Sequence, residues 1–273
     1  MPELPEVETV VRGLREPLIG RTIQSVWWDW TKSIRYPDPH SFAARVSGQT
    51  VRAIERRAKY ILCRFDEDIL VVHLKMTGRL YVVGDNEILD SDRWAHVRFQ
   101  LDGGRQLRFS DSRKFGFVTL VTDINEIAPS LGPEPLSDEF TPSVLKMRIS
   151  KHQKSIKAVL LDQHVLAGVG NIYADEALHM AKIHPMRGAS GLSNEEIARL
   201  YTAIRTVLSE GIEREGASVN WYRKPDGTSG DAQNHFAVYD REGEACLTCG
   251  SPIYKTRVAQ RGTHFCATCQ PLP

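Results

Sequence analysis

Four cysteines near the C-terminus carry the clearest chemical signal in this sequence of 273 residues. They form two C-x-x-C pairs on either side of residues 250–265: Cys246, Cys249, Cys266 and Cys269. Thiolates at this spacing are typical ligands of one tetrahedral, structural zinc ion. Two disulfides are the alternative, but such pairs in a chain expected in the cytoplasm favour zinc. The metal would replace the core that a module of about 35 residues cannot build.

The segment between the two cysteine pairs predicts a β-hairpin. The stretches IYKTRV and THF are rich in β-branched and aromatic residues, and they would join near residues 259–262. Arg261 would then stand at the tip of a stiff hairpin. The fifth cysteine, Cys63, lies in an apolar strand-like run, so we expect it in the core.

The first residues of the chain, MPELPEVETV, hold a second unusual pattern. Pro5 suits the first position of a helix, and Glu6 and Glu8 suit a first turn near the positive end of the helix dipole. A stripe of apolar residues at helical spacing follows them. This explanation leaves out Pro2 and Glu3, which precede the expected helix.

The overall charge of the chain says little about its partners, but the local charge says more. A formal net charge of +1, with 41% apolar and 25% charged residues, is ordinary for a globular protein. Four segments are nevertheless strongly basic: residues 52–59, 105–114, 146–157 and 255–261. One such cluster is more often a solvated face. Four of them, offset by acidic stretches elsewhere, indicate one-sided polarity and a partner with a phosphate backbone.

The two large parts of the chain differ in their expected secondary structure. Residues 1–131 hold six strand-like runs: TIQSVWWDW, YILCRF, ILVVHLKM, HVRFQL, QLRFSD and GFVTLV. Asp102-Gly103-Gly104 reads as a hairpin turn between two of them. Many short strands with little helix predict a β-sandwich or barrel. LGPEPL then reads as a linker.

Helical signals follow the linker. Thr141 before Pro142 is a good helix start, and Ser193 with Glu196 forms a capping box before a long apolar stripe. Between them, AGVG reads as a tight turn that leads into a helix capped by Asn171. Glycines beside a helix N-terminus make an accessible anion site, although an ordinary helical hairpin explains the pattern equally well. YRKPDGTSGDAQNH, residues 222–235, has the composition of a long functional or disordered loop.

PELPEVET, AGVGNIYADE and QRGTHF enclosed by the cysteine pairs are together similar to formamidopyrimidine-DNA glycosylases. These bacterial base-excision-repair enzymes remove oxidised purines such as 8-oxoguanine and formamidopyrimidines. The resemblance covers essentially the whole chain, and the motifs follow in the expected order. It implies an α+β fold of four parts, with damaged double-stranded DNA in the cleft between the two main ones. The parts are an N-terminal catalytic β-sandwich (1–131), a helix–two-turn–helix domain (132–222), a lesion-capping loop (223–236) and a β-hairpin zinc finger (237–273).

The resemblance also explains the first residues. Removal of Met1 before a small residue leaves Pro2 as a terminal secondary amine. The reference pKa of an α-amino group is roughly 7.7–8.0, so a useful fraction is neutral and nucleophilic near pH 7. In the family this nitrogen attacks the sugar carbon that bears the damaged base, and an iminium then permits strand cleavage by β- and δ-elimination. Glu3 would shuttle protons, and Glu6 either holds the substrate or only starts the helix.

Further roles follow from the resemblance, position by position. Lys59 matches a phosphate-contacting lysine that donates a proton in β-elimination, and Arg261 matches the zinc-finger arginine linked to δ-elimination. His73 and Asn171 match phosphate contacts, and Lys157 matches a lysine near the lesion pocket. Met76, Arg113 and Phe115 match the trio that fills the gap left by the extruded nucleotide. From the residues alone, Met76 and Phe115 would be core and Lys157 a solvated charge.

The sequence departs from the family pattern at three places. The family often has Lys-His-x-His where this chain has Arg93-Trp94-Ala95-His96, so the first histidine, a DNA-binding residue in the family, is replaced by Trp94. The proline after the lesion-pocket lysine is replaced by Ala158. The family's Asp-Pro-Arg segment is Asp111-Ser112-Arg113.

Two other functions remain open at this stage. An endonuclease VIII-like glycosylase would act on oxidised pyrimidines with the same nucleophile, but that branch typically opens Pro-Glu-Gly-Pro, whereas this chain has Leu4. A non-catalytic damaged-DNA-binding zinc protein would need the basic clusters and the zinc site but not Pro2 and Glu3. No run of 18 apolar residues and no signal-peptide region occur. We therefore expect a cytoplasmic chain without membrane contact. The resemblance further implies a monomer that is associated with the bacterial nucleoid.

Overall fold

The computed structural model describes residues 1–219 and 221–272. The chain divides into two compact units, each with parts from separate stretches of sequence. The first unit holds residues 1–129 and 215–230, and the second holds residues 130–214 and 231–273. Residues 215–219 and 221–222 therefore belong to the first unit, although they closely follow the last long helix. The four-part division expected from the sequence stays a prediction.

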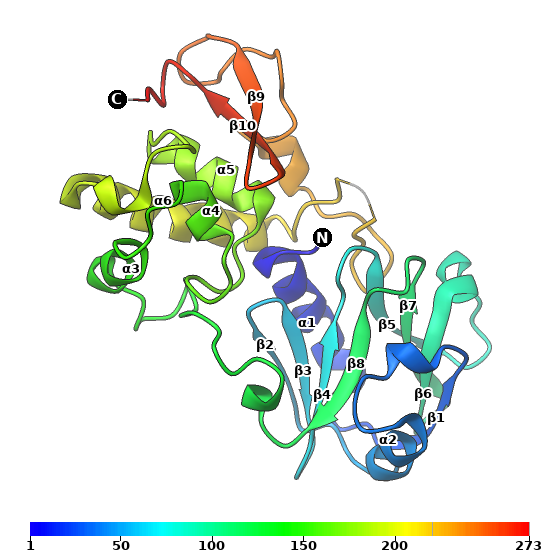
Figure 1. The fold of residues 1–273 in the computed structure, drawn as a ribbon. Helices are drawn as coiled ribbons and strands as arrows, with labels where there is room; N and C mark the ends of the chain where they lie inside the picture. Colours follow the sequence, from blue (N-terminus) through cyan, green and yellow to red (C-terminus); the bar gives the residue numbers. More distant parts are fainter. Residues whose placement is uncertain (220, 273) are drawn as a thin grey trace. The chain divides into compact units, whose positions relative to one another are not determined.

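The first unit is a sandwich of two antiparallel four-stranded sheets (Figure 1). One sheet has the order β1-β6-β7-β5, formed by Ile23–Trp28, Ala95–Leu101, Arg105–Asp111 and Gly78–Gly84. The other has the order β2-β3-β4-β8, formed by Ala53–Arg57, Tyr60–Arg64, Ile69–His73 and Phe117–Val121. The β-sandwich expected from the sequence is confirmed.

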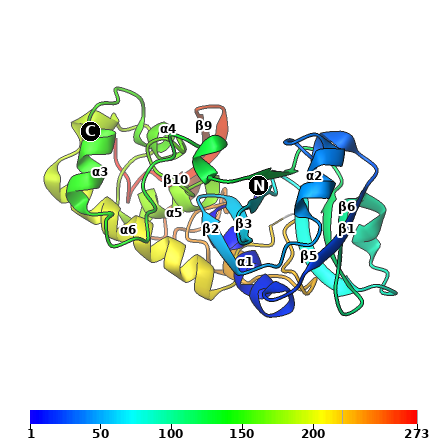
Figure 2. The same cartoon turned by 90° about the horizontal axis from the view of Figure 1, so that it is seen from below.

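Two helices complete this unit. Helix α1, Leu4–Leu18, begins with Pro5 in its first turn and buries the apolar stripe that its sequence predicts. Helix α2, Pro39–Val46, is capped by the side chain of Asp38 and lies beside β1 (Figure 2). Residues of α1, α2 and both sheets share one hydrophobic core, so burial of apolar surface fixes α1 against the sandwich.

The second unit combines helices with one small sheet. Its helices are α3 (Pro142–Ile149), α4 (Ile156–Leu160), α5 (Asn171–Met180) and α6 (Asn194–Glu213). Thr141 caps α3 and Ser193 with Glu196 forms the capping box of α6, which confirms both predicted helix starts. The two-stranded sheet β9–β10, Ile253–Val258 and Arg261–Cys266, forms the expected hairpin.

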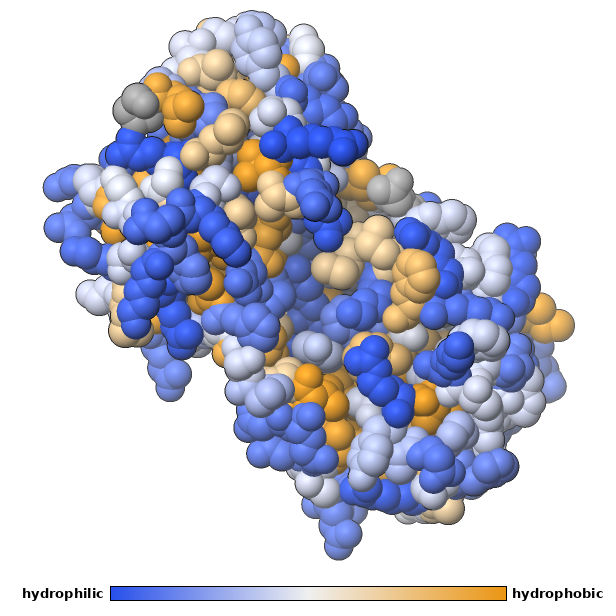
Figure 3. Space-filling view, in the orientation of Figure 1, coloured by the Kyte–Doolittle hydropathy of each residue, from blue (hydrophilic) through white to orange (hydrophobic). Residues whose placement is uncertain are grey.

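The short helical turns lie in the connections between these elements: Thr31–Ser33 (η1), Asp90–Trp94 (η2), Ile124–Glu126 (η3), Ala189–Gly191 (η4) and Ala232–His235 (η5). The last of them lies within the predicted loop 223–236. Among the described residues, no helix is both long and apolar enough to span a membrane. On the face seen in Figure 3, hydrophilic side chains cover most of each unit, and the apolar ones lie in smaller areas among them.

Candidate active site and nucleic-acid interface

Pro2 and Glu3 lie at the N-terminal end of α1, where both side chains are buried. The amide of Glu3 donates a hydrogen bond of 2.7 Å to Oε2 of Glu6. The second carboxylate oxygen of Glu6 accepts from the amide of Ala217 at 2.8 Å. Glu6 therefore does act as a helix-start residue. It also ties the backbone of Glu3 to a segment more than two hundred positions away in the sequence.

In that distant segment, Gly216 and Ala217 lie close to Glu6. Gly216 has φ of +80°, and a Cβ at this position would lie 3.0 Å from Cγ of Glu6, so a larger residue would be strained and crowded. The hydroxyl of Tyr222 donates to the carbonyl of Glu215 at 3.1 Å. Burial raises the pKa of Tyr222, and the negative charge of Glu6 raises it further. The sequence patterns did not indicate that this segment contacts Glu6. Gly216, shortly after the end of α6, is nevertheless a recognisable signal for the end of a helix.

Lys59 lies in the tight turn between β2 and β3, where Ala58 adopts a left-handed conformation with φ of 52°. The side chain of Lys59 is buried. Arg56 spans the turn: it donates to the carbonyl of Ala58 at 3.0 Å and to the carboxylate of Glu8 at 3.1 Å. This ion pair links the turn to α1. Figure 1 shows the N-terminus and the β2–β3 turn at the same end of this unit.

The strand register places His73 in the same region. Tyr60 pairs with His73, and His73 pairs with Phe117, so the three residues form one row at the end of their sheet. Their rings are in contact, with centroids 4.7 Å and 5.7 Å apart. Lys59 precedes this row and Phe115 lies two residues before Phe117. Three separate stretches of sequence, around Lys59, His73 and Phe115, therefore bring candidate residues to the same end of this sheet.

His73 is uncharged in this environment. Burial lowers its pKa most, and the positive charges of Lys75, Lys59 and Arg35 add to this effect, so that the pKa is about 3. Its Nδ1 atom accepts a hydrogen bond from the amide of Lys75 at 3.0 Å. A neutral imidazole that accepts through Nδ1 carries its proton on Nε2, so His73 can offer a neutral N–H donor to a phosphate oxygen.

The loop that carries Arg113 and Phe115 is organised by the buried carboxylate of Asp111. One oxygen accepts from the amide of Arg113 and from the hydroxyl of Thr77. The other accepts from the amides of Phe115 and Gly116 at 2.8 Å and 2.6 Å. These bonds fix the backbone of the loop and leave its side chains free to point outward.

The side chains of the predicted trio are exposed. Met76 is 39% exposed and Phe115 is 53% exposed, and the guanidinium of Arg113 lies 4.7 Å from the centre of the Phe115 ring. Contiguous exposed apolar patches mark contact surfaces, whereas single exposed apolar side chains are common in folded proteins. The structure therefore gives no support to the core positions that the residue types alone suggest for Met76 and Phe115.

In the second unit, the predicted cap of α5 is wrong in detail. Gly170 is the capping residue, and Asn171 is the first residue of the helix. The side-chain amide of Asn171 instead donates to the carbonyl of Gly262 in the zinc-finger hairpin at 3.0 Å. A second N–H of this amide group can serve another acceptor, such as a phosphate oxygen.

Lys157 is also placed differently from the expectation. It is 0% exposed, and its ammonium group lies 2.7 Å from the carboxylate of Asp175. It donates to the carbonyl of Gly262 and to the hydroxyl of Thr263 at 3.0 Å and 2.8 Å. This burial contradicts the solvated position that the residue type alone suggests for Lys157, while the role in DNA binding that the resemblance implies stays a prediction.

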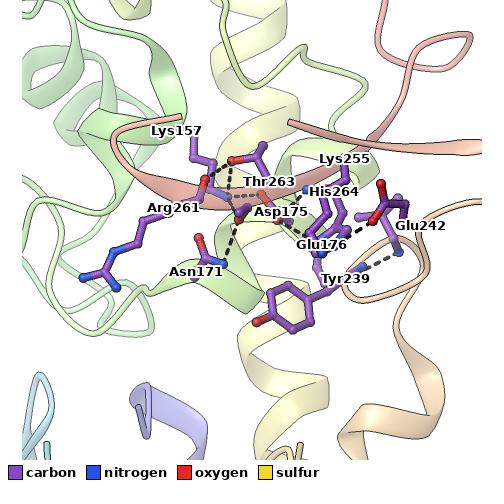
Figure 4. A network of polar contacts seen from close by, with 12 residues as sticks. Lys157, Asn171, Asp175, Glu176, Tyr239, Glu242, Lys255, Arg261, Thr263 and His264 are labelled. Atoms are coloured by element: carbon purple, nitrogen blue, oxygen red, sulfur yellow. Dashed lines mark hydrogen bonds and ion pairs between the residues drawn. The ribbon is translucent and has the colours of Figure 1, made fainter. Parts of the chain in front are cut away.

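Helix α5 holds the zinc finger through four polar side chains, of which Asn171, Asp175 and Glu176 are labelled in Figure 4. Asn171 and Asp175 reach β10, where Asp175 accepts from the amide of His264 at 2.9 Å. Glu176 accepts from the amides of residues 237–239, and Nε2 of His179 lies 3.5 Å from Sγ of Cys246. Spacings of three and four residues place these side chains on adjoining sides of the helix. The motif NIYADEALH is therefore a docking site for the finger.

The four cysteines converge as the sequence predicts. Their Sγ atoms all lie within 4.8 Å of one another, with Cys246–Cys269 at 3.9 Å and Cys249–Cys266 at 3.4 Å. A tetrahedron of sulfurs at the usual Zn–S distance has edges of about 3.8 Å, so the cluster fits one zinc ion. In contrast, burial raises the pKa of Cys63 to about 12, as expected for a core thiol.

Arg261 begins β10 directly after a two-residue turn. Ala259 and Gln260 both have positive φ, 48° and 61°, which suits a tight hairpin between twisted strands. Arg261 is exposed, and the hydroxyl of Thr263 donates to its carbonyl at 3.0 Å. The predicted position of this arginine at the hairpin tip is confirmed.

Comparison with known proteins agrees with this arrangement. Three family models match: the N-terminal domain of formamidopyrimidine-DNA glycosylase over residues 1–118, its H2TH domain over 131–223, and the zinc finger found in FPG and IleRS over 243–272. A formamidopyrimidine-DNA glycosylase of Symbiobacterium thermophilum is 50% identical over 277 residues, 100% of this chain and 90% of that protein. The chain belongs to the formamidopyrimidine-DNA glycosylase family.

Other members of the glycosylase family are similar over their full length. The enzyme of Herpetosiphon aurantiacus is 48% identical over 276 residues, with 99% of this chain and 100% of that protein covered. The crystal structure of MutM (Fpg) from Thermus thermophilus superposes with a TM-score of 0.89 at 40% identity and complete coverage of both chains. Lactococcus lactis Fpg in complex with DNA containing an abasic site gives 0.91 at 34% identity, with 99% and 100% covered.

The chain therefore carries the zinc finger of the glycosylase family, with four cysteines placed to bind one ion. At the departure from the family pattern, Trp94 contacts the ring of Trp221, with centroids 6.2 Å apart, and the guanidinium of Arg93 lies 3.9 Å from the centre of the Trp94 ring. His96 is buried and lies 2.7 Å from the carboxylate of Asp29. The contacts of Trp94 and His96 within the protein are sufficient to explain the positions of these two side chains.

Proposed function

We propose that the chain is a bifunctional DNA glycosylase and abasic-site lyase that removes oxidised purines, such as 8-oxoguanine and formamidopyrimidines, from double-stranded DNA. The observation that carries this proposal is the buried pair Pro2–Glu3, fixed at the start of α1 by the carboxylate of Glu6. A terminal secondary amine beside a carboxyl group provides both a nucleophile and a proton carrier.

The amine of Pro2 would attack the sugar carbon that bears the damaged base. The C–N bond to the base breaks, and the base leaves with the bonding electrons and a proton delivered by way of Glu3. Proton loss from nitrogen and opening of the sugar ring give an iminium between Pro2 and the sugar. The iminium acidifies the neighbouring sugar protons, so β-elimination and then δ-elimination release the two phosphate ends.

Other residues would bind and prepare the DNA. Met76, Arg113 and Phe115 would fill the space of the extruded nucleotide, where wedge side chains offset the lost stacking. His73, Asn171 and Arg261 would contact phosphates, and Lys59 would donate a proton in β-elimination. The exposure of Met76, Arg113, Phe115 and Arg261 supports these roles, and Lys59 and His73 lie near one end of the sheet β2-β3-β4-β8. We further propose that the chain works at the bacterial nucleoid, where its substrate is.

The zinc ion would be structural. Four cysteine ligands close the tetrahedron and leave no position for water or substrate, so the metal would only hold the hairpin that presents Arg261. The endonuclease VIII-like alternative is not favoured, since the full-length relatives are named formamidopyrimidine-DNA glycosylases. A non-catalytic DNA-binding protein would have no use for a terminal secondary amine at Pro2 beside the carboxyl group of Glu3.

Borohydride trapping tests this function directly. The chain, after removal of Met1, is incubated with duplex DNA that holds 8-oxoguanine opposite cytosine, and borohydride reduces any iminium to a stable cross-link. Mass spectrometry should place the adduct on Pro2. Duplex DNA without damage should give no adduct. An adduct on a lysine of the unaltered chain, or no cross-link with active material, would contradict the proposal.

A further inference from the structure

We propose that Lys157 is a positioning residue for Arg261: from inside the second unit, it fixes the hairpin turn that presents this arginine to DNA. The inference rests on the proposed function, because Arg261 must contact a phosphate for its position to matter. It gives the buried Lys157 an indirect part in DNA binding, in place of the direct contact that the family resemblance implies.

The contacts of Lys157 lead to Arg261 in one short chain of hydrogen bonds (Figure 4). The ammonium group donates to the hydroxyl of Thr263 at 2.8 Å, and this hydroxyl donates in turn to the carbonyl of Arg261 at 3.0 Å. The ammonium group also donates to the carbonyl of Gly262 at 3.0 Å. Lys157 therefore holds the two peptide groups that follow Arg261, one directly and one through the hydroxyl of Thr263.

Asn171 supports the same point. Its side-chain amide donates to the carbonyl of Gly262 at 3.0 Å, so this single backbone oxygen receives two side-chain donors from two different helices, α4 and α5. A carbonyl oxygen has two lone pairs and can accept both. The turn is thus anchored on α4 and on α5, the helix that follows the AGVG turn.

The hairpin needs such anchors. Strands β9 and β10 form a sheet of only two strands, and an isolated two-stranded hairpin is marginally stable in water. The zinc ligands lie outside the turn, with Cys266 at the far end of β10. Zinc alone would therefore hold the base of the hairpin and leave its tip mobile, whereas Lys157 acts near the tip.

The buried charge of Lys157 is unusual for a residue with a purely structural role. Asp175 balances this charge at 2.7 Å, and both side chains are completely buried. Burying two ions costs about as much free energy as their attraction returns, so an apolar pair often stabilises a fold equally well. What an apolar pair cannot supply is donors to Gly262 and Thr263. The ion pair therefore fits a requirement for geometry at the turn.

A double-mutant cycle tests the inference. Lys157→Met alone would leave Asp175 buried and unpaired, so the test variant is Lys157→Met with Asp175→Asn, whose side-chain oxygen can still accept from the amide of His264. This pair is made in the unaltered chain and in an Arg261→Ala chain. The dissociation constant is measured for a duplex with a tetrahydrofuran abasic-site analogue, across a series of salt concentrations. Zinc content and thermal midpoint are measured for every variant.

In the unaltered background, we expect the pair of substitutions to weaken binding about tenfold and to lower the salt slope by about one unit, with zinc retained. In the Arg261→Ala background, the same pair should change binding by less than about twofold, because its effect passes through Arg261. Equal reductions in affinity in both backgrounds, or no reduction in either, would overturn the proposal.

Two further variants keep the test independent of folding. Thr263→Val removes only the hydroxyl between Lys157 and Arg261, so it should weaken binding in the unaltered background and not in the Arg261→Ala background. Lys182→Met removes a positive charge from an exposed position of the same unit and should leave affinity near that of the unaltered chain.

If the unaltered chain does not prefer the abasic-site duplex over undamaged DNA, the proposed function fails. If it does but the cycle is additive, only the role of Lys157 fails.

Discussion

The carboxylate of Glu6 accepts a hydrogen bond from the amide of Glu3 at 2.7 Å, and this bond fixes the backbone of the residue that follows Pro2, the proposed nucleophile. The same carboxylate accepts from Ala217, so one side chain joins the start of α1 to the segment after α6. The first turn of α1 is therefore fixed from two directions, and a catalytic pair at its start would be pre-organised.

Glu6→Ala should accordingly slow base removal more than it weakens DNA binding. The substitution leaves the buried amides of Glu3 and Ala217 without their acceptor, which costs about 1–3 kcal/mol for each such group. Single-turnover excision of 8-oxoguanine and affinity for an abasic-site analogue are measured together. Glu16→Gln, an exposed carboxylate of the same helix, is the control. A variant with normal excision but weak binding would show that Glu6 serves the DNA instead.

Retention of Met1 should abolish the chemistry and preserve DNA binding. With Met1 attached, the nitrogen of Pro2 is an amide, which is neither basic nor nucleophilic. Material with and without Met1 can be separated and identified by mass spectrometry. Each form is assayed for cleavage of 8-oxoguanine duplex and for affinity to an abasic-site analogue. Cleavage by the form that retains Met1 would exclude Pro2 as the nucleophile.

Arg113→Ala should slow excision from duplex DNA and weaken the preference for cytosine opposite the lesion. The guanidinium has donors suited to the acceptor edge of the orphaned cytosine, and the loop that carries it is already fixed by Asp111. The variant should therefore keep its fold. Excision rates are compared with each of the four bases opposite 8-oxoguanine. Unchanged rates and an unchanged order of preference would remove Arg113 from this role.

Two substitutions separate zinc binding from DNA binding in the finger. Cys249→Ala should release zinc, unfold the finger and weaken DNA binding, because the metal supplies the stability of this small module. Arg261→Ala should leave zinc bound and the fold intact. It should still weaken binding and reduce the salt slope by roughly one unit for each phosphate group that Arg261 neutralises. Zinc content and affinity across a salt series check both variants. An Arg261→Ala chain with unaltered affinity and slope would place the DNA contact elsewhere.

His73 should make the first unit sensitive to acid. Its pKa is about 3 in the folded chain, against an ordinary value of 6.5, so folding favours the neutral form. The resulting stability is complete above pH 6.5 and is lost as the pH falls from 6.5 towards 3. The free energy of unfolding should fall in this window by at most about 1.4 kcal/mol per pH unit for this one group.

His73→Gln should flatten that dependence, because glutamine does not titrate. Denaturant unfolding is measured between pH 4 and pH 7 for the unaltered chain, for His73→Gln and for His40→Gln, which replaces an exposed histidine of the same unit. Identical slopes for the unaltered chain and His73→Gln would show that His73 is accessible to protons in the folded state.

The sequence by itself determined most of the local structure. Runs of β-branched and aromatic residues located six strands, because such residues favour a half-buried extended chain. It did not reveal β2 or β5: AIERR in β2 is largely charged, and glycines bound β5. The helix N-caps and the zinc ligands could also be predicted from the sequence, since both depend on residues that lie a few positions apart.

Only the tertiary structure decided where the polar residues act. Asn171 reads as a local cap, yet its side chain reaches a carbonyl 91 positions away. Lys157 lies in a basic run that predicts a solvated face, but its partners Asp175 and Gly262 come from α5 and the zinc-finger hairpin. A lysine is long enough to serve either surface or core, and its environment is set by packing between distant segments. Residue type and spacing carry no information about that packing, so the burial that turns a charge into an anchor appears only in the folded chain.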